Sequence, residues 1–131
     1  MVKIFTEDYF SKVPNRSLEK LAKDYLRADH ILSRSMTIIQ IGLKWDNEYA
    51  KYSKLLLSEL NEEIHFEHPR LGISSAWTNA IVLAENLKSK DYLKLKNAFA
   101  KWPKEEKELL FNWMKDHNEQ RNILEFGKID P

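Results

Sequence analysis

The sequence predicts an all-α protein, a compact bundle of five to six helices. Only three glycines and four prolines occur in 131 residues, and this scarcity favours long helices over tight turns. Apolar residues recur at steps of three and four along most of the chain, as they do on the buried face of a helix. Hydrophobic residues make up 43% of the chain and aromatic residues 11%, so we expect residues 1–131 to form one domain around one core.

The first two helices follow from capping residues and periodicity. Thr6 can cap a short helix over residues 7–12, which Pro14 would end. Ser17 can cap a long central helix near residues 17–44, whose second half is apolar nearly all round. The residues expected on the buried face of this helix are Leu18, Leu21, Ala22, Tyr25, Leu32, Met36, Ile39 and Leu43.

Two alternatives compete with one continuous helix in this region. Apolar residues also alternate within residues 37–43, so a β-strand there is the first alternative. Residues 21–34 match part of the helix-turn-helix pattern of DNA-binding proteins, which is the second. However, Leu26 and Arg27 occupy the turn, where that motif prefers a glycine followed by an apolar residue. The unbroken periodicity favours the single helix.

The next two helices flank a loop that contains Pro69. Asp46 can cap a helix that continues until Pro69 stops it. Its inner face is expected to carry Tyr49, Tyr52, Leu56, Leu60 and Ile64. Ser74 or Ser75 can cap the following helix, which is expected to direct inward Trp77, Ala80, Ile81, Ala84 and Leu87.

The C-terminal part predicts a helical hairpin. Ser89 can cap a helix over residues 89–102, and Pro103 suits the first turn of a helix over residues 103–126. Gly127 is a typical C-terminal cap. The second helix carries the apolar residues Leu109, Leu110, Trp113, Met114, Ile123 and Leu124. Because the connection is so short, the two helices must pack as an antiparallel or angled pair.

The composition excludes several classes of function. The net charge is +1, so nucleic acid or membrane could bind only at a local patch. The absence of cysteine excludes disulfides, thiol catalysis and cysteine-based metal centres, and it fits a reducing cytoplasm. No segment resembles a membrane span or the apolar core of a signal peptide. We therefore expect a cytoplasmic protein without a cofactor and without contact to a membrane.

The stretch NEEIHFEHPRLG, residues 61–72, holds the strongest candidate for metal chemistry. Glu62 and His65 have the Glu-x-x-His spacing of di-iron helical bundles, and His68 lies one turn further on. Such sites need a second motif of this kind, and the sequence holds none. Glu62, His65 and His68 are therefore weak metal candidates, and a metal-dependent helical enzyme centred on Glu62 and His65 is the third hypothesis for function.

The acidic segment 59–67 is also a candidate surface for a protein partner. Its carboxylates crowd the end of the expected helix, where the helix dipole disfavours negative charge. Either a partner uses this cluster or basic residues packed across from it offset the charge. The acidic contact residues are Glu59, Glu62, Glu63 and Glu67. Trp45, beside a helix boundary, is either an exposed interface anchor or a residue that closes one end of the bundle.

Lysines dominate residues 88–104. Those expected to make contacts are Lys88, Lys90, Lys94, Lys101 and Lys104. Lys90, Lys94 and Lys101 fall on one narrow stripe of a helix, opposite its apolar face. This stripe could contact a phosphate backbone, an acidic protein, or the acidic segment 59–67 of another copy in head-to-tail self-association. It could also be an ordinary solvated face.

The leading hypothesis is a non-enzymatic helical subunit that interacts with a protein partner through the acidic and lysine surfaces. No nucleophile motif and no glycine-rich phosphate loop is present. The second hypothesis is an accessory protein that contacts nucleic acid without sequence specificity.

Overall fold

The fold is all-α, as the sequence predicts. The computed structural model describes residues 1–10 and 13–129, and this part of the chain contains no strand. Its α-helices are α1 (Leu18–Lys20), α2 (Ile31–Lys44), α3 (Tyr49–Glu59), α4 (Ser75–Asn86), α5 (Tyr92–Phe99), α6 (Lys104–Trp113) and α7 (Asn118–Phe126). Shorter turns are the 3-10 helices η1 (Glu7–Phe10), η3 (Asp46–Glu48), η4 (Glu63–Phe66) and η5 (Ser89–Asp91), and the π-helical turn η2 (Leu21–Tyr25). The alternative β-strand over residues 37–43 is wrong, because this segment lies within α2.

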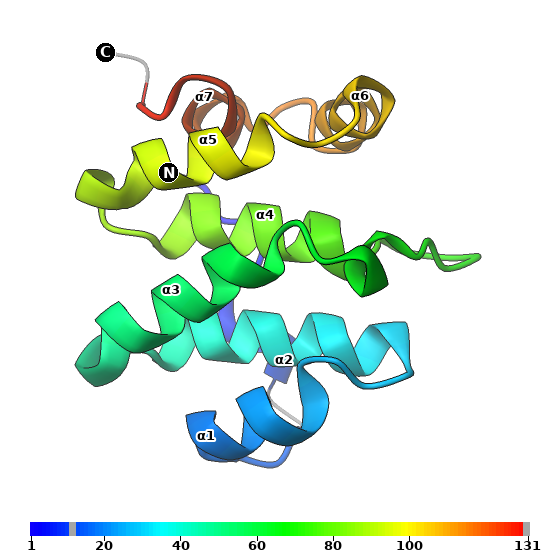
Figure 1. Ribbon diagram of the computed structural model, residues 1–131, viewed down its shortest axis with the longest axis vertical. Coiled ribbons are helices and arrows are strands. Elements are labelled where there is room, and N and C mark those ends of the chain that lie inside the picture. The colour runs from blue at the N-terminus through cyan, green and yellow to red at the C-terminus, as the bar shows by residue number, and fades with distance from the viewer. Residues whose placement is uncertain (11–12, 130–131) are drawn as a thin grey trace.

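Helix α4 is the centre of the molecule. Figure 1 shows the helices in successive layers, with α2 and α3 on one side of α4, and α5, α6 and α7 on the other. Helix α4 packs against α2, α3, α5 and α7. Every residue of α4 from Ser75 to Glu85 is buried, polar residues included. Its N-terminus is capped by Ser74, whose Oγ accepts a hydrogen bond from the Trp77 amide at 3.1 Å, which confirms one of the two predicted caps.

The predicted long helix over residues 17–44 is wrong as a single element. The chain turns at residues 26–30, between η2 and α2. The predicted buried face included Leu32, but this side chain is 61% exposed. Helix α2 is the apolar second half of the predicted helix, and its residues from Thr37 to Gly42 are all buried. The turn lies where the helix-turn-helix alternative places one, but residues 37–42 of α2 are buried and cannot contact DNA. Contact through the exposed start of α2 stays a prediction.

Glycine at position 42 lets α2 and α4 approach closely. A Cβ at Gly42 would overlap the Cγ1 atom of Val82 on α4. The two helices make the most extensive contact between any two elements among the described residues. This close approach brings apolar side chains of both helices into one core.

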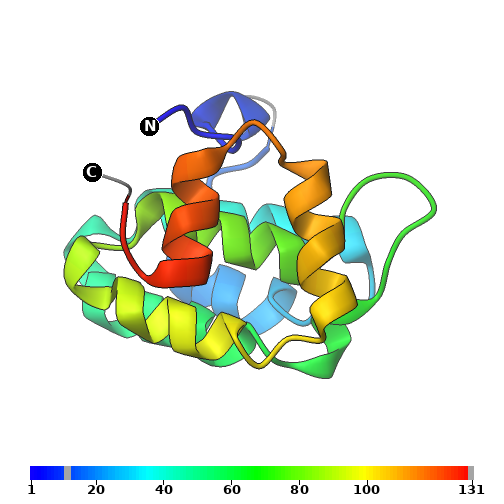
Figure 2. The same ribbon diagram turned by 90° about the horizontal axis from the view of Figure 1, so that it is seen from above.

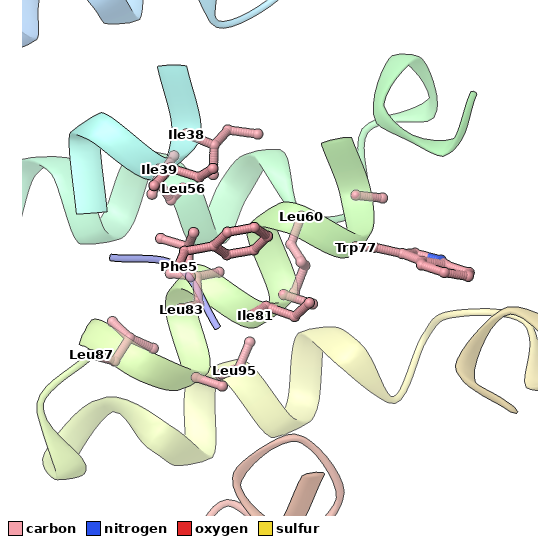
Figure 3. Close-up of a cluster of buried hydrophobic side chains, with 14 of the residues drawn as sticks. Phe5, Ile38, Ile39, Leu56, Leu60, Trp77, Ile81, Leu83, Leu87 and Leu95 are labelled. Carbon is pink, nitrogen blue, oxygen red and sulfur yellow. The ribbon is translucent and has the colours of Figure 1, made fainter. Parts of the chain in front are cut away.

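The N-terminal segment is held in the core by a buried carboxylate. Glu85 of α4 accepts hydrogen bonds from the backbone amides of Ile4 and Phe5 and, at 2.8 Å, from Nε2 of Gln120 on α7. Both Glu85 and Gln120 are buried. The Phe5 ring therefore lies among apolar side chains of α2, α3 and α4 (Figure 3).

Two of the predicted helices, those expected over residues 46–69 and 103–126, are shortened or broken in the structure. The helix capped at Asp46 was expected to reach Pro69, but α3 ends at Glu59. The second helix of the predicted hairpin is broken between α6 and α7. The partner that packs most closely against α5 is consequently α7 (Figure 2). Gly127 caps α7 in the left-handed conformation, with φ of 69°, as predicted.

None of the described helices has the length and apolar character needed to cross a lipid bilayer.

We expect Gly42→Ala to destabilise the protein by about 1–3 kcal/mol, because the added methyl group forces α2 and α4 apart. The better helix propensity of alanine offsets only part of this cost. Urea denaturation followed by circular dichroism measures the change. Asn97→Ala, on the exposed face of α5, is the matched control and should stay within about 0.5 kcal/mol of the parent. An equal stability of both variants would show that the helices have room at this contact.

Candidate functional site

The predicted acidic surface divides into a buried and an exposed part. Glu59 is buried, with its carboxylate 2.8 Å from Nη2 of Arg27, so it is not a contact residue for a partner. Glu62 and Glu63 are exposed, and Glu62 lies 3.6 Å from the same arginine. Glu67 is 63% exposed and pairs with Arg34. Arg27 and Arg34, packed across from the cluster, thus pair with three of its four carboxylates, in line with the second of the two readings of the sequence. Two positive charges against four carboxylates leave the segment acidic.

His65 is fully buried at the centre of a hydrogen-bonded chain of side chains. Its Nε2 lies 3.0 Å from the Glu59 carboxylate, and its Nδ1 lies 2.8 Å from Oγ of Ser75. A carboxylate only accepts, so Nε2 is the nitrogen that donates. The Ser75 hydroxyl shares a hydrogen bond with Nδ1 and accepts another from Nε of Arg34, at 3.2 Å. The chain joins η4, α3, α4 and α2.

Arg34 extends this chain to the turn before α2. It is only 1% exposed, and its Nη1 donates to the carbonyl oxygens of Ala28 and Asp29, at 2.7 and 3.1 Å. Its Nη2 donates to Glu67 at 3.3 Å. A buried charge is tolerated where its donors are paired in this way. Arg34 therefore holds together the turn at residues 26–30, α4 and the segment that follows η4.

Ser75, His65 and Glu59 stand in the order of a nucleophile, a base and an orienting acid. This constellation was not visible in the sequence, because the three residues have no motif spacing. However, Ser75 and His65 are 0% exposed and Glu59 only 5%. The Ser75 hydroxyl also accepts from a buried guanidinium, so no substrate can reach it in this structure. The constellation joins helices here and offers no open catalytic centre.

The predicted metal ligands do not converge. Both nitrogens of His65 are engaged inside the core, whereas Glu62 lies at the surface beside Arg27. His68 points elsewhere, with its Nε2 2.6 Å from Glu106 and its ring edge-on to Trp77. Across residues 1–10 and 13–129, no three histidine or carboxylate side chains gather where they could hold a metal ion. The hypothesis of a metal enzyme centred on Glu62 and His65 therefore has no structural support.

The five lysines proposed for nucleic-acid contact are all exposed. Lys88 lies over the Tyr49 ring, 4.5 Å from its centroid, and Lys94 lies 3.2 Å from Asp91. Tyr49 donates to Asp91 at 2.6 Å, and burial together with this bond raises the pKa of Tyr49 to about 12. Leu95 and Phe99 of α5 are buried on the side opposite these lysines, where the apolar face of the helix was predicted. Whether the exposed stripe has a partner stays a prediction, as does head-to-tail association.

The exposed tryptophan is Trp113, not Trp45. Trp45 is 3% exposed and packs edge-on against Tyr49, so its role as an interface anchor is wrong and it closes an end of the bundle. Trp113 is 48% exposed, although its helical phase suggested a core position. Leu109, one turn earlier on α6, is also exposed. The break after Trp113 was not visible in the sequence, and it separates the buried faces of α6 and α7.

Trp113 borders an open apolar cleft of about 640 Å³. The cleft lies between the N-terminal part of α2, the segment 67–73 and the end of α6. Segment 67–73 projects from the body of the molecule (Figure 2). The apolar side chains that line the cleft include Phe5, Leu32, Met36, Ile39, Leu71 and Ile73. Leu71 is 91% exposed, so this wall presents a large apolar surface to water.

Two carboxylates lie at the edge of this cleft. Asp29 and Glu67 both line it, and both are attached to Arg34, Asp29 through its backbone carbonyl and Glu67 through its side chain. Within the described residues no cation pairs with the Asp29 carboxylate. The buried polar chain thus positions the acidic rim of the cleft.

Acid should destabilise the fold through Glu59. Burial raises the pKa of the Glu59 carboxyl, but the hydrogen bonds from His65 and Arg27 outweigh burial and hold the pKa below its ordinary value. A lowered native pKa stabilises the fold above the unfolded pKa, near 4.3, and this contribution disappears as pH falls through the native value. We expect Glu59→Gln to unfold with a shallower pH dependence than the parent below about pH 5. Urea titrations at several pH values measure this, and the exposed Glu48→Gln should retain the parental slope.

We expect Arg34→Met to destabilise the protein by about 2–4 kcal/mol, because it leaves two carbonyls and the Ser75 hydroxyl without their donor. Thermal and urea unfolding measure the loss. Lys44→Met, on the exposed end of the same helix, controls for removal of a charge. If both variants lose the same stability, the hydrogen bonds of Arg34 are not what holds the turn.

Comparisons with protein-family models, with curated proteins and with solved structures find no match to this chain.

Proposed function

We propose that this protein is an interaction subunit whose apolar cleft binds a basic segment of a partner protein. The observation that carries the proposal is the cleft itself, with Trp113, Leu71 and Leu32 exposed around it. Large apolar side chains gathered at one concave surface are typical of a binding site, whereas single exposed ones are ordinary.

The volume and the walls of the cleft suit side chains of a protein. About 640 Å³ lies within the usual range for binding pockets and can take two or three apolar side chains. A half-exposed tryptophan beside an exposed leucine is the kind of surface that becomes an energetic hot spot on binding. Burial of Trp113 and Leu71 against a partner would remove both from water.

The charges at the rim of the cleft determine which charges a bound segment can carry. Asp29 and Glu67 attract lysine or arginine, and the exposed Glu62 and Glu63 add negative charge nearby in the sequence. Asp29 is free to pair, since Arg34 takes only its carbonyl. The occupant is therefore a short segment with apolar anchors flanked by basic residues, and an acidic segment would be repelled.

Peptide display tests the proposal. We expect a random library to yield peptides with two or more large apolar residues beside lysine or arginine. Trp113 is the exposed tryptophan, whereas Trp45, Trp77 and Trp102 are buried, so binding should shift tryptophan emission to shorter wavelength. Trp113→Ala or Leu71→Asp should weaken a selected peptide by at least about tenfold.

Leu93→Ala is the matched control, because Leu93 is 58% exposed on α5, outside the cleft. Its affinity for the selected peptides should remain parental. Enrichment of acidic peptides, or peptides that bind Trp113→Ala as tightly as the parent, would refute the proposal. Sedimentation of the protein alone tests whether a second copy of the chain occupies the cleft. If the protein dimerises and Trp113→Ala abolishes the dimer, the occupant is a second copy and not a basic segment of a partner.

A further inference from the structure

A second cleft lies between α5, α6 and α7, and its chemistry differs from that of the first. It measures about 340 Å³ and is lined by four basic side chains, Lys96, Lys104, Lys107 and Arg121, against two acidic ones, Glu108 and Glu125. Lys96 and Lys104 belong to the lysine-rich segment 88–104 seen in the sequence, whereas Lys107 and Arg121 lie outside it. The fold brings these cations together from three helices.

The floor of this cleft is apolar, and a guanidinium lies over one of its aromatic rings. Phe99 and Leu124 are buried, and the Phe111 ring lies 5.7 Å from the Phe99 ring, centroid to centroid. The guanidinium carbon of Arg121 lies 4.8 Å above the Phe111 centroid. A guanidinium above an aromatic ring can stack a planar group on its outer face, as in proteins that stack nucleobases.

The basic side chains around this floor are available to an anion. Lys104 lies 3.9 Å from Glu108, and Arg121 lies 3.5 Å from Glu125, both as exposed pairs one helical turn apart. Such pairs contribute little, so a phosphate can compete with them. Within the described residues Lys96 has no ion pair. Lys107 donates to the Ala100 carbonyl, at 3.5 Å.

We propose that this cleft binds a nucleotide unit, with its base on the Arg121–Phe111 stack and its phosphate among Lys96, Lys104 and Lys107. A positively charged groove beside a stacking platform is the usual arrangement for single-stranded nucleic acid. Lys101, next to Ala100 in the wall of the cleft and just past the end of α5, is exposed and adds positive charge beside it. The unit could belong to a single strand or to a free nucleotide, and the two are separated by experiment.

Fluorescence anisotropy with fluorescein-labelled single-stranded dT15 tests the cleft at low salt. We expect binding that weakens as salt rises, and competition by AMP at concentrations where inorganic phosphate has no effect. The double variant Lys96→Glu/Lys107→Glu should weaken binding at least about tenfold. Arg121→Lys keeps the charge but removes the planar face, and should weaken binding roughly three- to tenfold.

Lys23→Glu/Lys54→Glu is the matched control, because it makes the same charge change at exposed positions away from the cleft. Thermal unfolding of every variant ensures that folded proteins are compared. No anisotropy change at low salt, an equal loss in the control, or equal competition by AMP and phosphate would each overturn the proposal. If these results support the proposal, the affinity of AMP identifies the ligand. AMP that binds as tightly as dT15 indicates a free nucleotide, and AMP that binds much more weakly than dT15 indicates a single strand.

Discussion

The buried guanidinium of Arg34 is the constraint on which the arrangement of this protein depends. A charge with 1% exposure must have its donors paired, and Arg34 pairs them with two carbonyls of one turn, a serine of α4 and a carboxylate after η4. Apolar packing alone would allow these segments to slide against one another. The directional bonds specify one position for the turn at residues 26–30, and this turn starts α2 at the edge of the apolar cleft.

The two clefts of the molecule form for different reasons. The first forms where α2, the segment 67–73 and α6 leave an apolar gap beside Arg34's own partners, so its rim is acidic. The second forms because α7 folds back beside α5, and Gly127, which ends α7 in the left-handed conformation, lies against Leu93 and Lys96 of α5. That cleft collects cations from three helices. A molecule with a net charge of +1 thus has one cleft with acidic residues at its rim and another lined mainly by basic residues.

Periodicity predicted helix type and most buried faces, because the apolar pattern directly reflects burial. Tyr52, Leu56, Leu95 and Phe99 lie in the core as expected. Helix ends were less predictable, since the break at residues 26–30 depends on Arg34, which lies six positions beyond Ala28. The cation cluster and the Ser75–His65–Glu59 chain join residues without local spacing. Trp113 was misplaced because the helix breaks directly after it, and the buried side of α6 passes through Leu110 and Met114 instead.

The hydrogen bonds of Glu85 affect the order in which the chain folds. Its carboxylate joins amides at positions 4 and 5 to a glutamine at position 120, across 81 and 35 residues of sequence. Contacts this distant form late, because closing a long loop precedes any gain from the contact. During synthesis, Glu85 has no partner in Gln120 until α7 has emerged from the ribosome. The N-terminal segment and the last helix are therefore expected to dock together and to detach together, as one cooperative unit on the surface of an already assembled α2–α4 core.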